Sequence, residues 1–557
     1  MAYEDILAAV DAVRLMDSVR AICTGERLSN EAEVRSFDVL EKLFTDAGCR
    51  VTREALPGYV STPEGAAFEA GGIAYEVLTH PMTPSADGLE ADLVYVPVDR
   101  TGSASAEEVS GRIVLTDGLA MEPVVRALED RGAAGVVFIT GEEIHNMIVS
   151  RVWGSPTPET LHDYVGIPVA SLSFGDGTRL RARLAEAGGT LPARLSTRVE
   201  SRWTEIPVIT AEIRGADEDF VMVTGHVDSW GLGALDNASG NACAVELARI
   251  LAPLASDMRR SVRFVLWSGH SHGRYAGSTA WCDAHFEELE RHCLLNVNSD
   301  CLGGRGATVM TESPAMASTR GLARTALREA AGVTDWRGCR FSRSCDQSFW
   351  GAGVPSIFSQ VSEQPPFEGA AADAFGKMFG SGRTGGFGAW WHTRTDTPDK
   401  LDPENLARDV RVFASVLAHA LFDERLPVDA AAEVLELRDE LKTWQEKAGD
   451  SLDLSEVLAR LDLLAEALKA AARSDDPKRF EKRSRRVLSE IIPLAYVEGS
   501  VYSHDEALRA PPVPMLRLID ELASLSEHER NAALVSLRRA VNRLKASTAR
   551  ALEAARA

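Results

Sequence analysis

The stretch VMVTGHVDSWGLGALDNASG, from Val221 to Gly240, decides how this chain is expected to fold. Its start belongs to a short apolar run, FVMVTGH (220–226), which is typical of a buried strand. The segment after it, SGNACAVELARILAPL (239–254), has the apolar spacing of a helix. His226, Asp228 and Asp236 therefore belong to a predicted strand-to-helix connection.

Two more apolar runs continue this pattern, SVRFVLWSG (261–269) and CLLNVNSD (293–300). Strands that alternate with helices predict an α/β fold with a doubly wound, mixed or mainly parallel sheet. In such sheets, ligands bind beyond the carboxyl ends of the strands. His226, His270 and Asp300 each follow a predicted strand, so we expect them at one edge of the sheet.

Changes in the pattern of apolar residues along the sequence divide the chain into three parts. Residues 1–85 and 203–428 form the predicted main domain, in which AGCRVTREALPGYVS (47–61) is interpreted as a strand and a turn. Residues 86–202 are predicted to form an inserted α/β module, because GRIVLTDG and GAAGVVFITG are Gly-bounded apolar runs. Residues 429–557 consist of amphipathic helices with few strand-forming residues and are predicted to be a helical domain.

Composition excludes several classes of partner. A net charge of −22 argues against nucleic acid and against an anionic membrane surface. No window approaches the ~20 apolar residues that span a bilayer, and the first twenty residues lack the features of a signal peptide. The eight cysteines are scattered without a CxxC pair. We therefore expect a cytoplasmic protein that acts on a small-molecule or peptide substrate.

The residues at the predicted strand ends have the chemistry of a hydrolytic metal centre. Such a centre needs neutral imidazoles, carboxylates and an open position for water. Asp236 follows on a Gly-rich turn, where its carboxylate could bridge two ions. The candidates on these grounds are His226, Asp228, Asp236, Asp300 and His392.

The motif GHVDSWGLGALDNASG (225–240) resembles the signature of the co-catalytic zinc aminopeptidases and carboxypeptidases of clan MH. The glutamate carboxypeptidase II and transferrin receptor type is the closer resemblance. NSDCLG (298–303) and WWHTRTDTPDKLD (390–402) match the later ligand segments of that family in order and rough spacing. The resemblance covers most of the chain. It implies that 86–202 is a protease-associated domain and that 429–557 pairs two subunits into a homodimer.

The same resemblance assigns roles to individual residues. His226, Asp236 and Asp300 would hold one ion, most simply zinc. Asp236 would bridge to a second ion that His392 also holds, and Asp228 would be the carboxylate that supports the site. The number of ions, one or two, stays open.

The sequence departs from the family at one point. After the strand FVLWSG the family has two consecutive glutamates, a general base and a metal ligand, where this chain has His270 and Ser271. The flanking residues match on both sides. Three outcomes follow: His270 replaces the base, His270 or His272 becomes a ligand for zinc or another transition metal, or the fold survives as a non-catalytic, receptor-like scaffold.

We favour a metal-dependent hydrolase of an amide or peptide C–N bond, with His270 and Asp228 as the catalytic candidates. Arg274 and Tyr275 are predicted to contact an anionic substrate. The segment SRSCDQSFWGAGVPSIF (342–358) resembles the family segment that lines the substrate pocket. Its Cys345, Asp346 and Gln347 are the remaining substrate-binding candidates.

Overall fold

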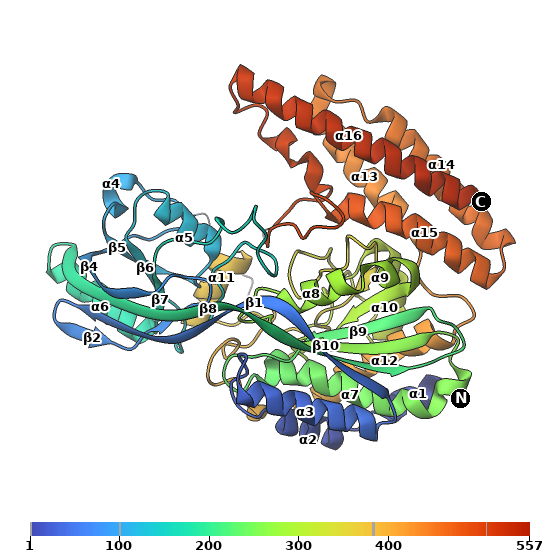
Figure 1. The fold of residues 1–557 in the computed structure, drawn as a ribbon, viewed down its shortest axis with the longest axis horizontal. Coiled ribbons are helices and arrows are strands. Elements are labelled where there is room, and N and C mark those ends of the chain that lie inside the picture. Colours follow the sequence, from blue (N-terminus) through green and yellow to red (C-terminus); the bar gives the residue numbers. More distant parts are fainter. Residues whose placement is uncertain (1–2, 100–101, 381–384, 508) are drawn as a thin grey trace.

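The computed structural model describes residues 3–99, 102–380, 385–507 and 509–557. Figure 1 shows three parts: a large α/β body, a smaller strand-rich module beside it, and an elongated bundle of helices above the large body. Among the described residues, twelve strands form one continuous hydrogen-bonded sheet that runs through the first two parts.

The sheet of the large body is mainly parallel, which confirms the predicted fold class. Its strands lie in the order β12 (Ser356–Ile357), β11 (Cys293–Asn298), β9 (Phe220–His226), β10 (Ser261–Trp267). All three of these neighbouring pairs are parallel. The carboxyl ends of the strands that precede His226, His270 and Asp300 therefore meet at one edge.

Helices cover both faces of this sheet (Figure 1). Val221 and Val223 of β9 point into one core, and Phe220 and Met222 point into another. The alternation is that of a strand buried on both faces. One face is covered by α2 (Ala12–Ile22), α3 (Glu31–Asp46) and α7 (Ser239–Leu251), and the other by α8 (Ala276–Ala284) and α9 (Phe286–His292). Helices α1 (Tyr3–Ala8), α10 (Arg320–Ala331), α11 (Ala370–Phe379) and α12 (Pro403–Phe422) complete the body.

Two very long strands join the large body to the smaller module. β1 (Arg50–Ala70) pairs with β8 (Thr190–Ile213) in antiparallel register along its whole length. The turn predicted within 47–61 is therefore wrong, because the chain stays extended through Pro57 and Gly58. Pro57 is tolerated there because β1 has a strand neighbour on one side only at that position, as on an edge strand.

The smaller module begins within β1 and not at residue 86. Phe68, Ala70 and Tyr75 share a core with Leu93 and Ile113 of the module. Its remaining elements are β2 (Ile73–Tyr75), β3 (Leu78–Thr79), β4 (Ala86–Tyr95), α4 (Ala106–Val109), β5 (Ile113–Asp117), α5 (Glu122–Glu129), β6 (Gly135–Ile139), β7 (Val169–Leu172) and α6 (Phe174–Glu186). The sequence did not reveal the earlier start because β1 stays extended where it changes core, with only a shift of pairing register between Pro63 and Gly65.

The C-terminal part is helical, as its amphipathic pattern predicts. It contains α13 (Ala430–Ala448), α14 (Ser455–Ser474), α15 (Pro477–Tyr496) and α16 (Glu527–Arg556). Buried Arg485 on α15 ties it to the large body by donating to the carbonyl oxygens of Leu289 and Ala352. Among the described helices, none has the length and apolar character needed to cross a bilayer.

Candidate metal centre

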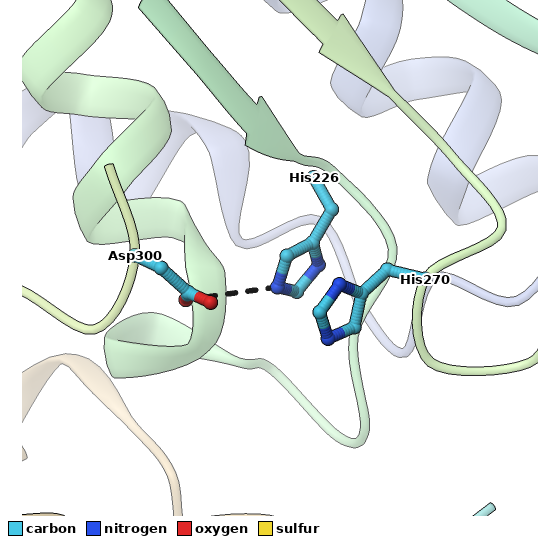
Figure 2. Close-up of side chains that lie close together, drawn as sticks. All are labelled: His226, His270 and Asp300. Carbon is cyan, nitrogen blue, oxygen red and sulfur yellow. Dashed lines mark ion pairs between the residues drawn. The ribbon is translucent and has the colours of Figure 1, made fainter. Parts of the chain in front are cut away.

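The ends of three parallel strands bring His226, His270 and Asp300 together (Figure 2). The rings of His226 and His270 stack with their centroids 3.7 Å apart and their planes within 11°. The Nε2 atom of His226 lies 3.7 Å from a carboxylate oxygen of Asp300. One ligand atom from each of the three residues falls within 4.8 Å of the others.

Asp236 lies between two imidazoles in a bridging arrangement. Its Oδ1 is 3.0 Å from Nε2 of His226, and its Oδ2 is 3.1 Å from Nε2 of His392. The Nδ1 atom of His392 donates to the carbonyl oxygen of Asn146 at 2.8 Å. That hydrogen bond leaves the lone pair of His392 on Nε2, facing Asp236.

Several ligand atoms of this cluster are buried without a hydrogen-bond partner of acceptable geometry. Among the described residues these include Nε2 of His226, Oδ1 of Asp236 and Oδ1 of Asp300. Buried polar atoms normally have hydrogen-bond partners, so these converging atoms are candidates to bind an ion between them. Imidazole nitrogens and carboxylate oxygens are the ligands of zinc and similar divalent ions. The donor set therefore fits a divalent metal.

Asp228 supports the cluster by binding the backbone of the loop that carries His270. Its carboxylate accepts the backbone N–H groups of His270 at 3.1 Å and Ser271 at 2.6 Å. Burial alone would raise the pKa of Asp228, but its hydrogen bonds with His226 and His272 outweigh burial and hold the pKa well below its usual range. Asp228 is therefore an anion that links the ends of β9 and β10.

His272 does not face the cluster of His226, Asp236 and Asp300, contrary to its place among the possible ligands. Its Nδ1 lies 3.0 Å from Oδ2 of Asp228, and its Nε2 lies 2.7 Å from Oγ of Ser29. Both ring nitrogens are thus engaged on the buried side of the loop.

His270 has a partner of its own, Asp346, which was predicted to bind substrate. The Nδ1 atom of His270 lies 2.6 Å from Oδ2 of the buried Asp346. The ring edge-packs against Tyr275 with centroids 4.9 Å apart. Asp346 therefore orients His270, in the way that a carboxylate orients a histidine base or a histidine ligand.

The other predicted substrate contacts lie around this pair. Gln347 is buried, and its Oε1 is among the atoms without a partner. Its Nε2 donates to the carbonyl oxygen of Cys345. The guanidinium of Arg274 lies over the ring of Tyr275 and donates to the carbonyl oxygen of Ala507 in the C-terminal part. Arg274 thus packs against the protein as well as lying near the site.

Two residues that position the candidate ligands carry no signal in the sequence. Buried Arg27 donates to the carbonyl oxygens of Val227 (2.6 Å) and Leu232 (2.7 Å), in the loop that connects His226 to Asp236. Asn146, from the smaller module, donates its backbone N–H to the carbonyl oxygen of His392 and accepts from Nδ1 of the His392 ring. An Arg beside a Gly-containing turn and an Asn in a loop give no local signal of these long-range roles.

The fold of this chain is similar to that of zinc aminopeptidases. The aminopeptidase from Aneurinibacillus sp. strain AM-1 superposes with a TM-score of 0.55 at 20% identity, over 77% of this chain and 98% of that one. A zinc aminopeptidase from Bacillus subtilis gives 0.56 at 18% identity, over 74% and 96%. At these identities the likeness concerns the fold.

Residues 208–417 match the model of Peptidase family M28, so the chain contains an M28 domain. A glutamate carboxypeptidase 2 homolog of Caenorhabditis elegans is 25% identical over 43% of this chain, but that match spans only 32% of the relative's own length. Aminopeptidase YwaD of Bacillus subtilis (strain 168) is 23% identical over 72% of this chain and 78% of its own.

Proposed function

We propose that this chain is a metal-dependent hydrolase of peptide or related amide C–N bonds, with aminopeptidase-like chemistry. The observation that carries the proposal is the convergence of buried imidazole and carboxylate atoms of His226, Asp236 and Asp300 at one sheet edge, where they lack hydrogen bonds of acceptable geometry. His226, Asp236, Asp300 and His392 would hold the divalent ion or ions, with zinc first. An ion held there supplies Lewis-acid chemistry by polarising a carbonyl and favouring ionisation of water.

The protein's own contribution to proton transfer comes from His270. Asp346 accepts from Nδ1 of His270, so the other ring nitrogen is free to take a proton from water. Tyr275 packs against the ring and limits its rotation. Asp228 holds the backbone of His270 and Ser271 in place. We propose His270 as the general base and Asp228 as the carboxylate that fixes it.

Metal removal and reconstitution test the proposal. Chelated protein should lose hydrolysis of aminoacyl and dipeptide substrates, and added zinc, cobalt or manganese should restore it. His226→Ala should bind less metal and show no restored activity, whereas His162→Ala, an exposed histidine of the smaller module, should behave like the wild type. Full activity in metal-free protein would contradict the proposal.

A non-catalytic scaffold is the second candidate, and Ser271 favours it. Ser271 stands where the resemblance implies a metal-binding glutamate, and its backbone N–H is bonded to Asp228. The scaffold would bind peptide without turnover. A protein that holds about one equivalent of metal, binds peptide in calorimetry and hydrolyses none of a broad peptide library would establish it.

Several finer features remain proposals. We propose that the smaller module is a protease-associated-like domain and that the protein is cytoplasmic; none of its eight cysteines, all within the described residues, forms a disulfide. We also propose a homodimer through the C-terminal helices, where Leu463 and Val535 are exposed apolar residues. Light scattering at micromolar concentration should give twice the 60.2 kDa chain mass. A monomer would contradict this part.

A further inference from the structure

Cys301 follows Asp300 directly and adopts an unusual backbone conformation. Its φ of 54° lies in the left-handed region, which a residue with a side chain adopts at a cost. The residue is 7% exposed, and its N–H lies 3.4 Å from the amide oxygen of Asn237, the residue after Asp236. Adjacent side chains on an extended strand point to opposite faces, but this conformation turns the chain after Asp300.

The turn brings the thiol to the same place as two carboxylates. The Sγ atom of Cys301 and one oxygen each of Asp236 and Asp300 lie within 4.8 Å of one another. The Oδ1 atoms of both aspartates are buried without a hydrogen-bond partner of acceptable geometry. Cys301 also belongs to the main hydrophobic core, so its thiol lies where that core meets the two carboxylates.

We propose that Cys301 is a sulfur ligand of an ion that Asp236 and Asp300 also hold. The inference rests on the proposed function, because it assumes that this cluster binds a divalent metal. On binding, the S–H bond breaks, the proton passes to solvent, and the sulfur electron pair forms the bond to the ion. A thiolate in the set would favour zinc and cobalt over magnesium, calcium or manganese.

Cobalt provides a direct readout of a sulfur ligand. The full chain is stripped of metal and titrated with Co²⁺ while its absorption spectrum and its bound cobalt are measured. The wild type should develop the near-ultraviolet charge-transfer band of a thiolate bound to cobalt. Cys301→Ser should still bind cobalt and lose that band. Its affinity should fall by about 10-fold or more, since even an outer partner of a ligand contributes about 10–100-fold.

Two further variants show which thiol gives the charge-transfer band. Cys345→Ser removes the other thiol close to Asp300 and should keep the band, and Cys301→Ala repeats the loss with a smaller side chain. A cobalt-loaded wild type without the band, or a band that vanishes only in Cys345→Ser, would overturn the role of Cys301 while leaving the metal site intact. A wild type that binds no more cobalt than His226→Ala would instead overturn the proposed function itself.

Discussion

At the residue scale, His270 depends on a partner that is distant in the chain. The Nδ1 atom of His270 contacts Asp346, while its backbone N–H contacts Asp228. One carboxylate therefore fixes the ring of His270, and the other fixes its backbone. This arrangement suits a general base, because the ring needs a defined orientation and a free nitrogen.

Substitution of His270 should separate catalysis from metal binding. We expect His270→Ala to keep its metal and to lose turnover by about 10²–10⁴-fold, as for a general base. Asp346→Asn should lower kcat by less, with metal content again unchanged. Loss of metal in His270→Ala would make His270 a ligand, and an unchanged rate would exclude both roles. Elemental analysis and steady-state kinetics provide the two readouts.

His80 should make stability depend on pH. It is fully buried beside Ser171 and Met147, and burial lowers its pKa to about 4. Because the folded-state pKa lies below the unfolded value of ~6.5, the unfolded state binds the proton first. The stability is complete above pH ~6.5 and is lost as the pH falls towards 4, by up to about 3 kcal/mol.

Urea unfolding at pH 7.0 and 5.0 tests this dependence. The wild type should lose stability between the two pH values, and His80→Gln should lose measurably less. His162→Gln, an exposed histidine of the same module, should follow the wild type. Equal losses in His80→Gln and the wild type would contradict the prediction.

At the element scale, two side chains from other parts of the chain hold the connection between β9 and α7. Arg27 reaches it from the segment between α2 and α3 and donates to Val227, Leu232 and, at 3.3 Å, Gly233. Buried Asp396 accepts the N–H groups of Leu235 and Asp236, and burial raises the pKa of Asp396 to about 7. The Gly-rich connection is therefore shaped by two distant residues.

Removal of Arg27 should weaken both stability and metal binding. Each buried carbonyl left without a donor costs about 1–3 kcal/mol, so Arg27→Leu should lower the free energy of unfolding by about 3 kcal/mol or more. Metal affinity should also fall, because the loop sets the distance between His226 and Asp236. Arg20→Leu, on the exposed face of α2, is the matched control. Wild-type metal affinity in folded Arg27→Leu would contradict the positioning role.

At the scale of the whole molecule, all three parts meet beside the site. Trp153 of the smaller module packs against Tyr275 with the ring centroids 4.1 Å apart and the planes tilted by 36°, and its indole N–H donates to Oγ of Ser348. Asp505 of the C-terminal part forms a 2.7 Å ion pair with Arg343, near Asp346 in the chain. The segment that orients His270 is therefore supported by both neighbours.

Asp505→Asn should impair catalysis although Asp505 lies in the C-terminal part, outside the large body. The pair with Arg343 is nearly buried, with side chains 11% and 7% exposed, so loss of one partner should cost about 3–5 kcal/mol. We expect a higher KM and a lower kcat at unchanged metal content. Asp520→Asn, which breaks an exposed pair with Lys447, should have little effect. Identical kinetics in both variants would show that the C-terminal part does not support the site.

The sequence by itself determined the sheet and the identity of its edge. Strand length and apolar content predicted β9, β10 and β11, and parallel strands necessarily present their carboxyl ends together. His226, His270 and Asp300 could therefore be placed near one another without coordinates. A local pattern suffices to predict these strands, because a strand buried on both faces is a short run of apolar residues.

Only the tertiary structure decided which residues surround His226, His270 and Asp300. Asp346, Arg27 and Asn146 act on the site through contacts that span 76 to 246 residues of chain. No local pattern encodes such a contact, since it depends on how separate elements pack. The same holds for β1 and β8, whose pairing continues from one core into another across a register shift between Pro63 and Gly65.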